Sequence, residues 1–557
     1  MRRTANSEAH IIGRPSWSQT IAELFRVHLR FIGPGLVAAI AYCDPGNWAT
    51  DLTAGSLYGY AHLFVILSAS LMAIVLQVLA ARLGYITGKD LAEHCRNKFY
   101  DRPRHKKLWR WGCLYPLYIL CEGGIIFTDL AELLGSAMAL HLLFPRMPLF
   151  VGVLLTSADV FLVLAFFNSY PSCSQKNRRS LHLFECCLAA LVAIVLVCFV
   201  VLLSKVKPVW GNTFMGFLPS RSMIADGGLY VAVSLIGATV MPHSIFLGSK
   251  VAVFDRLGTS SQCREAFQAD GPKTPDSLSS PLDLECSSSP DRTLAPRPPD
   301  ILVSAPCSLH SLQHLRKHLA HAGFDIAVSL ISLALPINAA ILIVAAAIFH
   351  SDESRSSDQA ADINTAYQLL SNRVAVAAAY IFAIALLLSG QAASITVTLA
   401  GQIVSEGFLE WRTNPVVRRL VTRLIGIVPC AIVAASAGLQ GVDTLLVASQ
   451  VALCLVLPFV LAPLIIFTSD PNVMSVTVIC SQDYPLKQRN SGGNRFYAQD
   501  LMQPVKEKII EDQRVSEVTA VHSFENSLLS KVVTWSIFVL CTVSNLYAII
   551  QLAQSSA

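Results

Sequence analysis

A few acidic residues fall within long apolar stretches of the chain, where a charged side chain is costly. One of them, Asp44, begins the run Asp44-Pro45-Gly46-Asn47 in the middle of an apolar segment. Proline removes a backbone donor, glycine weakens a helix, and Asp and Asn side chains compete for backbone hydrogen bonds. The run should unwind a membrane helix, which a bilayer tolerates only beside protein or a polar cavity. A carboxylate there is a candidate functional group; the alternative is a kink with a capping aspartate.

A second break is expected at Met241-Pro242-His243, in another long apolar segment. Pro242 frees the carbonyl of Ala238, because proline has no amide hydrogen. His243 lies near the middle of this span and could accept a proton or gate access. An ordinary proline kink with a packing methionine is the alternative. Two broken helices, one in each half of the chain, are typical of a five-plus-five inverted repeat with its binding site at the membrane midplane.

The groups that would converge at the two breaks favour a metal ion. They are Asp44, Asn47, the carbonyl of Ala238, and Met241. Carboxylate, amide and carbonyl oxygens suit a hard cation, whereas a thioether favours softer ions. This set predicts loose binding of a divalent first-row metal, and manganese and ferrous iron fit better than zinc or copper. Gln450 could add another oxygen, or instead make an interhelical hydrogen bond.

Three more acids, Glu122, Asp129 and Glu132, lie in a third apolar stretch. Their spacing places them on one face of a helix. Such a stripe inside a span predicts a proton path or a hydrated cleft; structural hydrogen bonds between helices are the alternative. Arg418 and Arg419 could neutralise these acids near one membrane surface.

The elements that carry these residues are long apolar helices. Of 557 residues, 53% are hydrophobic and only 14% are charged, against about 25% charged in an average soluble chain. This composition excludes a disordered protein, a basic nucleic-acid binder and an ordinary cytosolic enzyme. It predicts an all-α polytopic membrane protein. The eleven expected spans are 30–57, 61–86, 113–140, 148–167, 181–203, 227–254, 324–349, 374–403, 416–438, 442–468 and 528–552.

Polar segments flank and separate these spans. Loop 87–110 carries eight basic residues and the next connection, 141–147, is nearly uncharged, so the positive-inside rule places the N-terminus in the cytosol. The 15 cysteines fall in spans or cytosolic loops and are expected to be reduced thiols. The expected organisation is a cytosolic segment 1–29, a transmembrane core 30–468 with repeats 30–203 and 227–468, a disordered cytosolic loop 258–308, a cytosolic loop 470–526 and a final span 528–552.

The two break motifs resemble the paired signatures of the Nramp family of proton-coupled divalent metal transporters. Segments 390–396 and 449–451 add to the similarity, and the long loop before span seven resembles fungal members. The resemblance implies a LeuT-like fold with discontinuous helices 1 and 6. It also implies that manganese, ferrous iron and related ions such as cadmium and cobalt move inward with protons. No resident cofactor and no nucleic-acid partner are expected.

The resemblance further implies roles for individual residues. Metal ligation would fall to Asp44, Asn47, Ala238 and Met241, with Gln450 joining in some states. The implied proton route comprises Asp44, His243, Glu122, Asp129, Glu132, Arg418 and Arg419. Two departures stand out: many members carry a second histidine where this chain has Gly248, and Ser244 replaces a frequent asparagine. Any proton role of that second imidazole is therefore absent or relocated.

One feature lies outside the family pattern. His310, His314, His318 and His321 share one side of an expected amphipathic helix at the cytosolic membrane surface just before span seven. A pH-tuned polar face is the ordinary interpretation. The sharper hypothesis is that these histidines bind metal leaving the pore.

Alternative functions remain open from the sequence. A non-transporting metal sensor or receptor would use the same fold, and loops 258–308 and 470–526 leave room for it, although the intact ligand set argues against it. Another LeuT-like symporter, for amino acids, is disfavoured because an acid at the break would repel a substrate carboxylate. An enzyme is not expected, since the spans contain no nucleophile–base or cofactor motif. The expected location is the plasma membrane or a vacuolar or endosomal membrane.

Overall fold

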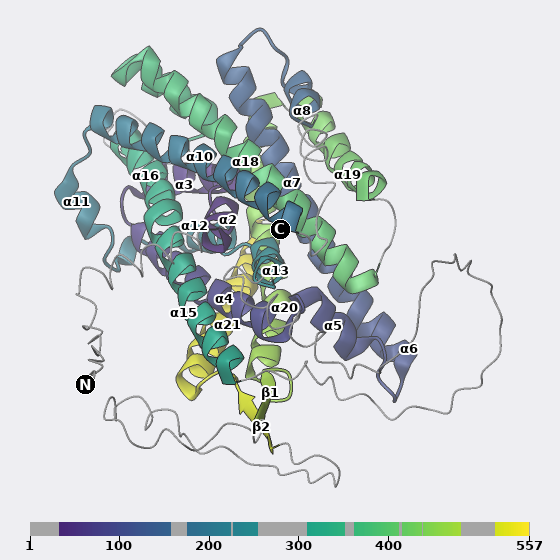
Figure 1. The fold of residues 1–557 in the computed structure, drawn as a ribbon. Coiled ribbons are helices and arrows are strands. Elements are labelled where there is room, and N and C mark those ends of the chain that lie inside the picture. The colour runs from purple at the N-terminus through teal and green to yellow at the C-terminus, as the bar shows by residue number, and fades with distance from the viewer. Residues whose placement is uncertain are drawn as a thin grey trace, which may run out of the picture.

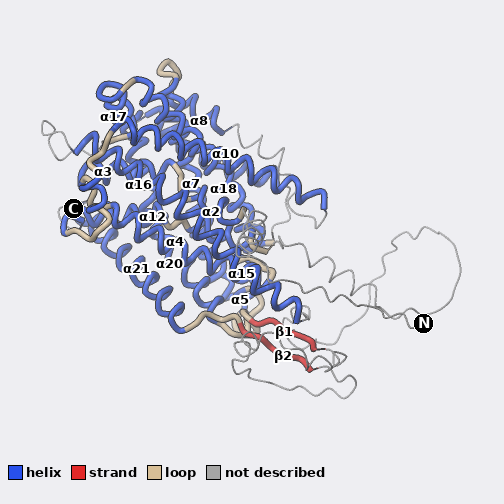
Figure 2. Tube along the Cα trace, turned by 60° about the vertical axis from the view of Figure 1, so that its left-hand side comes forward, coloured by secondary structure: helices blue, strands red, loops and turns tan. Residues whose placement is uncertain are grey.

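The computed structural model describes residues 33–157, 175–223, 227–253, 309–350, 361–410, 415–436, 438–480 and 518–555. Within them the chain forms an almost wholly helical bundle (Figures 1 and 2). Seven of the described helical segments are long and apolar enough to cross a membrane, and each covers most of an expected span. They are Leu63–Thr87, Glu185–Val206, Gly228–Val251, His314–His350, Val376–Leu409, Gly441–Ser469 and Leu528–Gln551. The predicted all-α class is confirmed.

The other four expected spans also have helical counterparts among the described residues. The first is divided into α2 (Pro34–Ala41) and α3 (Pro45–Tyr58), and the third is α7 (Tyr115–Leu143), whose acids lower its hydropathy. The fourth begins as α8 (Leu149–Ser157), and the ninth is α19 (Pro415–Ser436), which holds an internal proline.

The remaining helices follow in chain order. They are α4 (Leu63–Thr87), α5 (Leu91–Phe99), α6 (Lys106–Trp109), η1 (Arg110–Leu114), α10 (Gln175–Val206), α11 (Trp210–Met215), η2 (Arg221–Met223), α12 (Gly228–Thr239), α13 (Pro242–Val251), α15 (Leu309–Ser329), η3 (Leu330–Ala334), α16 (Leu335–Ala345), η4 (Ala346–His350), α17 (Ile363–Leu369), η5 (Leu370–Val374), α18 (Val376–Leu409), α20 (Gly438–Ser469) and α21 (Leu528–Ser555). Among them, η1, η3, η4 and η5 are π turns and η2 is a 3-10 turn.

The second half of the first span, α3, lies at the centre of the bundle. Helix α3 packs against α7, α12, α16 and α20. Trp48 is completely buried, with its ring 5.0 Å from that of Phe199 on α10 and 5.1 Å from that of Phe382 on α18. Aromatic burial of this kind fixes the start of α3, and therefore the residues of the first break, in the core.

One end of the bundle is braced by the short helix α5. Asp90 caps α5 by accepting from the Glu93 amide at 2.9 Å, and burial raises the pKa of Asp90 to about 6 although Lys250 opposes the shift. Lys250, at the end of α13, pairs with Asp90 at 2.9 Å and with Glu93 at 2.8 Å. Ser249 adds a hydrogen bond from the Leu91 amide at 3.1 Å. These contacts hold the end of α13 against α5.

A two-stranded antiparallel ribbon lies at the same end, away from α17 (Figure 2). It joins β1 (Ser475–Cys480) to β2 (Val518–Ser523), inside the segment 470–526 for which no regular structure was expected. Arg82 of α4 donates to the Phe524 carbonyl at 2.8 Å and to Asn526 Oδ1 at 3.1 Å, so that the chain after β2 is bound to the bundle. Strand pairing across a long sequence gap leaves no periodic signal in either strand alone, which explains why the ribbon was not predicted.

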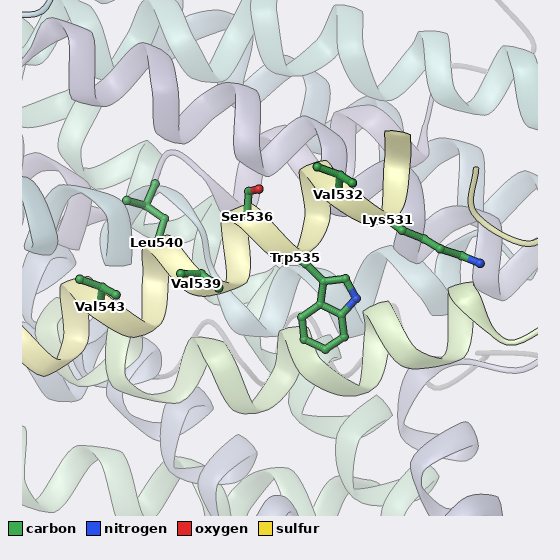
Figure 3. A pocket seen from close by; sticks show the side chains of 7 residues that line it. All are labelled: Lys531, Val532, Trp535, Ser536, Val539, Leu540 and Val543. Atoms are coloured by element: carbon green, nitrogen blue, oxygen red, sulfur yellow. The ribbon is translucent and has the colours of Figure 1, made fainter. Parts of the chain in front are cut away.

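Helix α21 packs along the side of the bundle against α20. A shallow hollow on its outer face is lined only by α21 side chains (Figure 3), namely Lys531, Val532, Trp535, Ser536, Val539, Leu540 and Val543. None of these is a candidate site residue, and an exposed apolar face on a membrane helix is suited to lipid contact. Among the cysteines whose side chains the structure describes, ten carry free thiols.

Candidate metal site

The first break is present where the sequence predicts it. Helix α2 ends at Ala41 and α3 begins at Pro45. Asp44 caps α3, accepting from the amides of Gly46 and Asn47 at 3.2 Å each, and its side chain is completely buried. Because Pro45 has no amide hydrogen, the Ala41 carbonyl has no helical donor four residues on. Ala41 is a site residue not predicted above, although the proline rule that identifies the Ala238 carbonyl identifies the Ala41 carbonyl as well.

The second break repeats this arrangement in the second half of the chain. Helix α12 ends at Thr239 and α13 begins at Pro242. The carbonyl of Ala238 likewise lacks its helical donor, since that position is Pro242. Met241 occupies the cap position of α13 in an extended conformation and is completely buried.

Gln450 of α20 lies between the two breaks. A Cβ atom placed on Gly46 would lie 1.7 Å from Gln450 Nε2 and 2.9 Å from Asp44 Oδ2. A Cβ atom on Gly237 of α12 would lie 2.5 Å from the Gln450 carbonyl oxygen. Glycine at both positions is therefore what lets α20 approach both broken helices. The expected proximity of Gln450 to Asp44 is thereby found.

Three buried amide side chains share one feature at the breaks. Asn47 and Asn338 both donate through Nδ2 to the Tyr42 carbonyl, at 2.7 and 3.0 Å, and Gln450 donates to Ser449 Oγ at 3.3 Å. The side-chain oxygens of Asn47, Asn338 and Gln450 have no hydrogen-bond partner in the described part of the chain. An unpartnered buried oxygen is costly, so such oxygens are expected to face a cation or water. Asn338, on α16, was not singled out from the sequence because a lone asparagine in a span has no distinguishing pattern.

The donor set is consequently poor in charge. Among the described residues, no group of three or more His, Cys, Asp or Glu side chains could hold a metal ion together. What the breaks offer is the carboxylate of Asp44, neutral amide and carbonyl oxygens, and the thioether of Met241. Such a set suits a divalent first-row ion held weakly enough to be released.

Two further buried titratable side chains adjoin the breaks. His243 is 2% exposed, and neither ring nitrogen has a hydrogen-bond partner among the described residues. Asp51 is also 2% exposed and lies two helical turns beyond Asp44 on α3. Asp51 is a further residue not predicted above, although its spacing of seven residues from Asp44 places both on one face of a helix.

The acidic stripe of α7 ends beside the first break. Asp129 is 8% and Glu132 1% exposed, whereas Glu122 is only partly buried. One turn after Glu132, a Cβ atom placed on Gly135 would lie 2.1 Å from the Pro45 Cβ atom, so that α7 directly contacts the break. The structure therefore brings the stripe to the site; its role as a proton route stays a prediction.

The expected pairing of the acids with two arginines cannot be placed. Arg418 and Arg419 lie on α19, but their side chains fall outside the described residues, as does the side chain of His310 on α15. Helix α19 does face the stripe, since a Cβ atom on Gly426 would lie 3.0 Å from Asp129 Oδ2.

The histidine-bearing segment differs from expectation. It is not a separate surface helix, because α15 continues through η3 and α16 into span seven. His318 is 2% exposed and stacks on Tyr85 of α4 with ring centroids 3.5 Å apart. This contact holds the segment against the bundle. The ring centroids of His314 and His318 are 6.3 Å apart, and the histidines, including His321, form no metal-binding group among the described residues. Their role in binding released metal stays a prediction.

The architecture is a bundle of apolar helices of membrane-spanning length, in which the broken helices α2–α3 and α12–α13 pack beside each other at the core. A family model described as "Natural resistance-associated macrophage protein-like" matches residues 35–480. The chain belongs to this Nramp family. That membership confirms the expected class of transporter, as opposed to enzyme.

Individual relatives agree with this assignment. The chain is 34% identical over 547 residues to the manganese transporter SMF1 of Saccharomyces cerevisiae, covering 96% of this chain and 88% of the relative. It is 39% identical to the iron transporter SMF3 of the same yeast, covering 82% of this chain and 84% of the relative. Its fold matches a crystal structure of the Eremococcus coleocola manganese transporter with a TM-score of 0.65 at 28% identity, covering 94% of this chain and 87% of that one.

Proposed function

We propose that this protein is a proton-coupled symporter of divalent transition-metal ions. Its substrates would be manganese, ferrous iron or both, with cadmium and cobalt as further ions, carried into the cytosol by alternating access. The observation that supports this most is the donor set at the breaks. Among the described residues, the buried side-chain oxygens of Asn47, Asn338 and Gln450 have no hydrogen-bond partner, and the breaks beside which they lie carry the carboxylate of Asp44 and the thioether of Met241. Neutral oxygens with one anion and one soft sulfur match these ions better than magnesium or zinc.

The titratable groups beside this set support the proposed proton coupling. His243 is buried without a protein partner among the described residues, and an imidazole is the side chain best suited to exchange protons near neutral pH. Helix α7, which carries the acidic stripe, packs against the same break where Gly135 meets Pro45. We place the N-terminus in the cytosol and the protein in the plasma membrane or a vacuolar or endosomal membrane.

The test is uptake of radioactive manganese into proteoliposomes with an acidic exterior, together with a pH-sensitive dye trapped inside. Wild type should accumulate manganese and acidify the lumen, whereas Asp44→Ala should do neither. Manganese binding without uptake would support the sensor or receptor alternative instead. Uptake that carries no protons would retain the metal substrate and overturn the coupling. Equal uptake by wild type and Asp44→Ala would overturn the site.

A further inference from the structure

Gln77, in the middle of α4, connects the two half-helices that lie on one side of the breaks. Its Nε2 donates to the Ser244 carbonyl on α13 at 3.2 Å, and its Oε1 accepts from the Tyr42 hydroxyl at 3.5 Å. Ser244 Oγ lies 2.8 Å from both the Tyr42 hydroxyl and the Met241 carbonyl oxygen. Tyr42 directly follows α2. The cluster thus links α2, α4 and α13 immediately beside the candidate ligands.

This cluster is closed to solvent. Tyr42 and Gln77 are each 1% exposed and Ser244 is completely buried. In such surroundings a hydrogen bond is strengthened by the low dielectric and is costly to break without a replacement. The hydrogen bonds among Tyr42, Gln77 and Ser244 therefore stabilise the packing of α2 against α13.

Gly248, one turn after Ser244 on α13, provides the space for the Gln77 amide. A Cβ atom placed on Gly248 would lie 1.9 Å from Gln77 Nε2 and 2.8 Å from its Cδ. The Gln77 side chain can reach the backbone of α13 only because that position has no side chain. Any larger residue at Gly248 would displace the amide unless residue 77 were made shorter.

We propose that Gln77 is a positioning residue for a gate formed by α2 and α13, and that Gly248 provides the space that the Gln77 side chain needs. The amide fastens α2 to α13 on one side of the metal site, so that the site opens toward that side only when these bonds break. This inference rests on the proposed transport function and extends it. Gln77 acts through the half-helices and is not itself a metal ligand.

The experiment uses Cys43 as a natural reporter. This thiol lies between Tyr42 and Asp44 and is 3% exposed, so a maleimide in solution should reach it mainly when α2 separates from α13. Labelling of the purified full-length protein is followed by mass spectrometry of the peptide that contains Cys43. Manganese uptake and its KM are measured in parallel.

Loss of the Gln77 bonds should shift the gate toward opening by about ten-fold, the size expected for one or two buried hydrogen bonds. Gln77→Ala and Gly248→Ala should therefore each increase Cys43 labelling about ten-fold. Both should lower the maximal uptake rate more than they change KM, because the ligands are untouched. Gly248→Ala combined with Gln77→Asn should return labelling and uptake toward wild type, since the shorter amide makes room for the methyl group.

Two matched controls test whether any loss of glutamine or glycine has this effect. Gln402→Ala removes an amide that bonds Glu406 within α18, and Gly123→Ala adds a methyl group where no atom lies within 4 Å. Neither should change labelling. Unchanged labelling in Gln77→Ala and Gly248→Ala, or failure of the double variant to recover, would overturn the gate role. Absence of manganese uptake by wild type would instead count against the proposed function, and the labelling comparison would still be informative.

Discussion

The sharpest prediction concerns the two roles of Asp44, which a single substitution can separate. Asp44 caps α3 through the amides of Gly46 and Asn47, and it is also the only acid within the two breaks. The two amides donate to different carboxylate oxygens, and Asp44→Asn keeps one of these acceptors. Asparagine is also as good a helix cap as aspartate, so the folding cost of Asp44→Asn should be under about 0.5 kcal/mol. Asp44→Ala removes the cap and should cost about 1–2 kcal/mol. Both lose the buried charge that attracts the metal, worth about 2–5 kcal/mol, or roughly 30- to 5,000-fold in affinity.

The measurements are manganese binding by calorimetry and thermal unfolding without metal, both on the purified full-length protein. Asp362 is a matched control, because it caps α17 by accepting from the Thr365 amide at 2.6 Å, away from the breaks. Asp362→Asn and Asp362→Ala should reproduce the stability difference and leave binding unchanged. Asp44 does not have these two separate roles if Asp44→Asn binds manganese within about three-fold of wild type, or if it destabilises the protein as much as Asp44→Ala.

Three other predictions address selectivity, pH and packing. Met241→Ala should lower cadmium uptake relative to calcium more than it slows manganese, because the thioether favours softer ions; the equally buried Met474→Ala should leave this ratio unchanged. Burial lowers the pKa of His94 from its usual 6.5 to about 4. Between these two pH values the unfolded chain therefore binds more protons than the folded chain. The free energy of unfolding should fall by up to about 3 kcal/mol as the pH falls through this range. His94→Gln should flatten the thermal stability profile over that range; an unaltered profile would contradict the assignment. Gly135→Ala should reduce uptake about ten-fold or more, because its Cβ atom would overlap the proline of the first break, whereas Gly123→Ala on the same helix has open space and should be neutral.

Much of the site was predictable because helix breaking is local. Pro45 and Pro242 remove amide hydrogens from their own helices whatever the surroundings, so both breaks were found from the sequence. The same local rule identifies the free carbonyls of Ala238 and Ala41, although only the first was named. The buried carboxylate Asp51 was equally within reach of a spacing argument.

Other features depend on contacts between distant segments, and no local pattern encodes them. Asn338 became a candidate only when α16 placed it on the same carbonyl as Asn47. The expected surface helix of histidines is instead continuous with span seven, because His318 packs on Tyr85 of another helix. The ribbon of β1 and β2 likewise forms from strands far apart in the chain.

The sequence by itself determined the membrane class and the two breaks, since hydrophobic length and proline chemistry act within a single segment. The tertiary structure alone decided which side chains meet there. Glycines at positions 46, 135, 237 and 248 carry no chemistry in the sequence, yet each allows a neighbouring helix to approach to a distance that a Cβ atom would prevent. Close packing between helices thus brings the amide oxygens to Asp44 and fastens Gln77 across α2 and α13. Such packing is a property of pairs of surfaces and is absent from either segment alone.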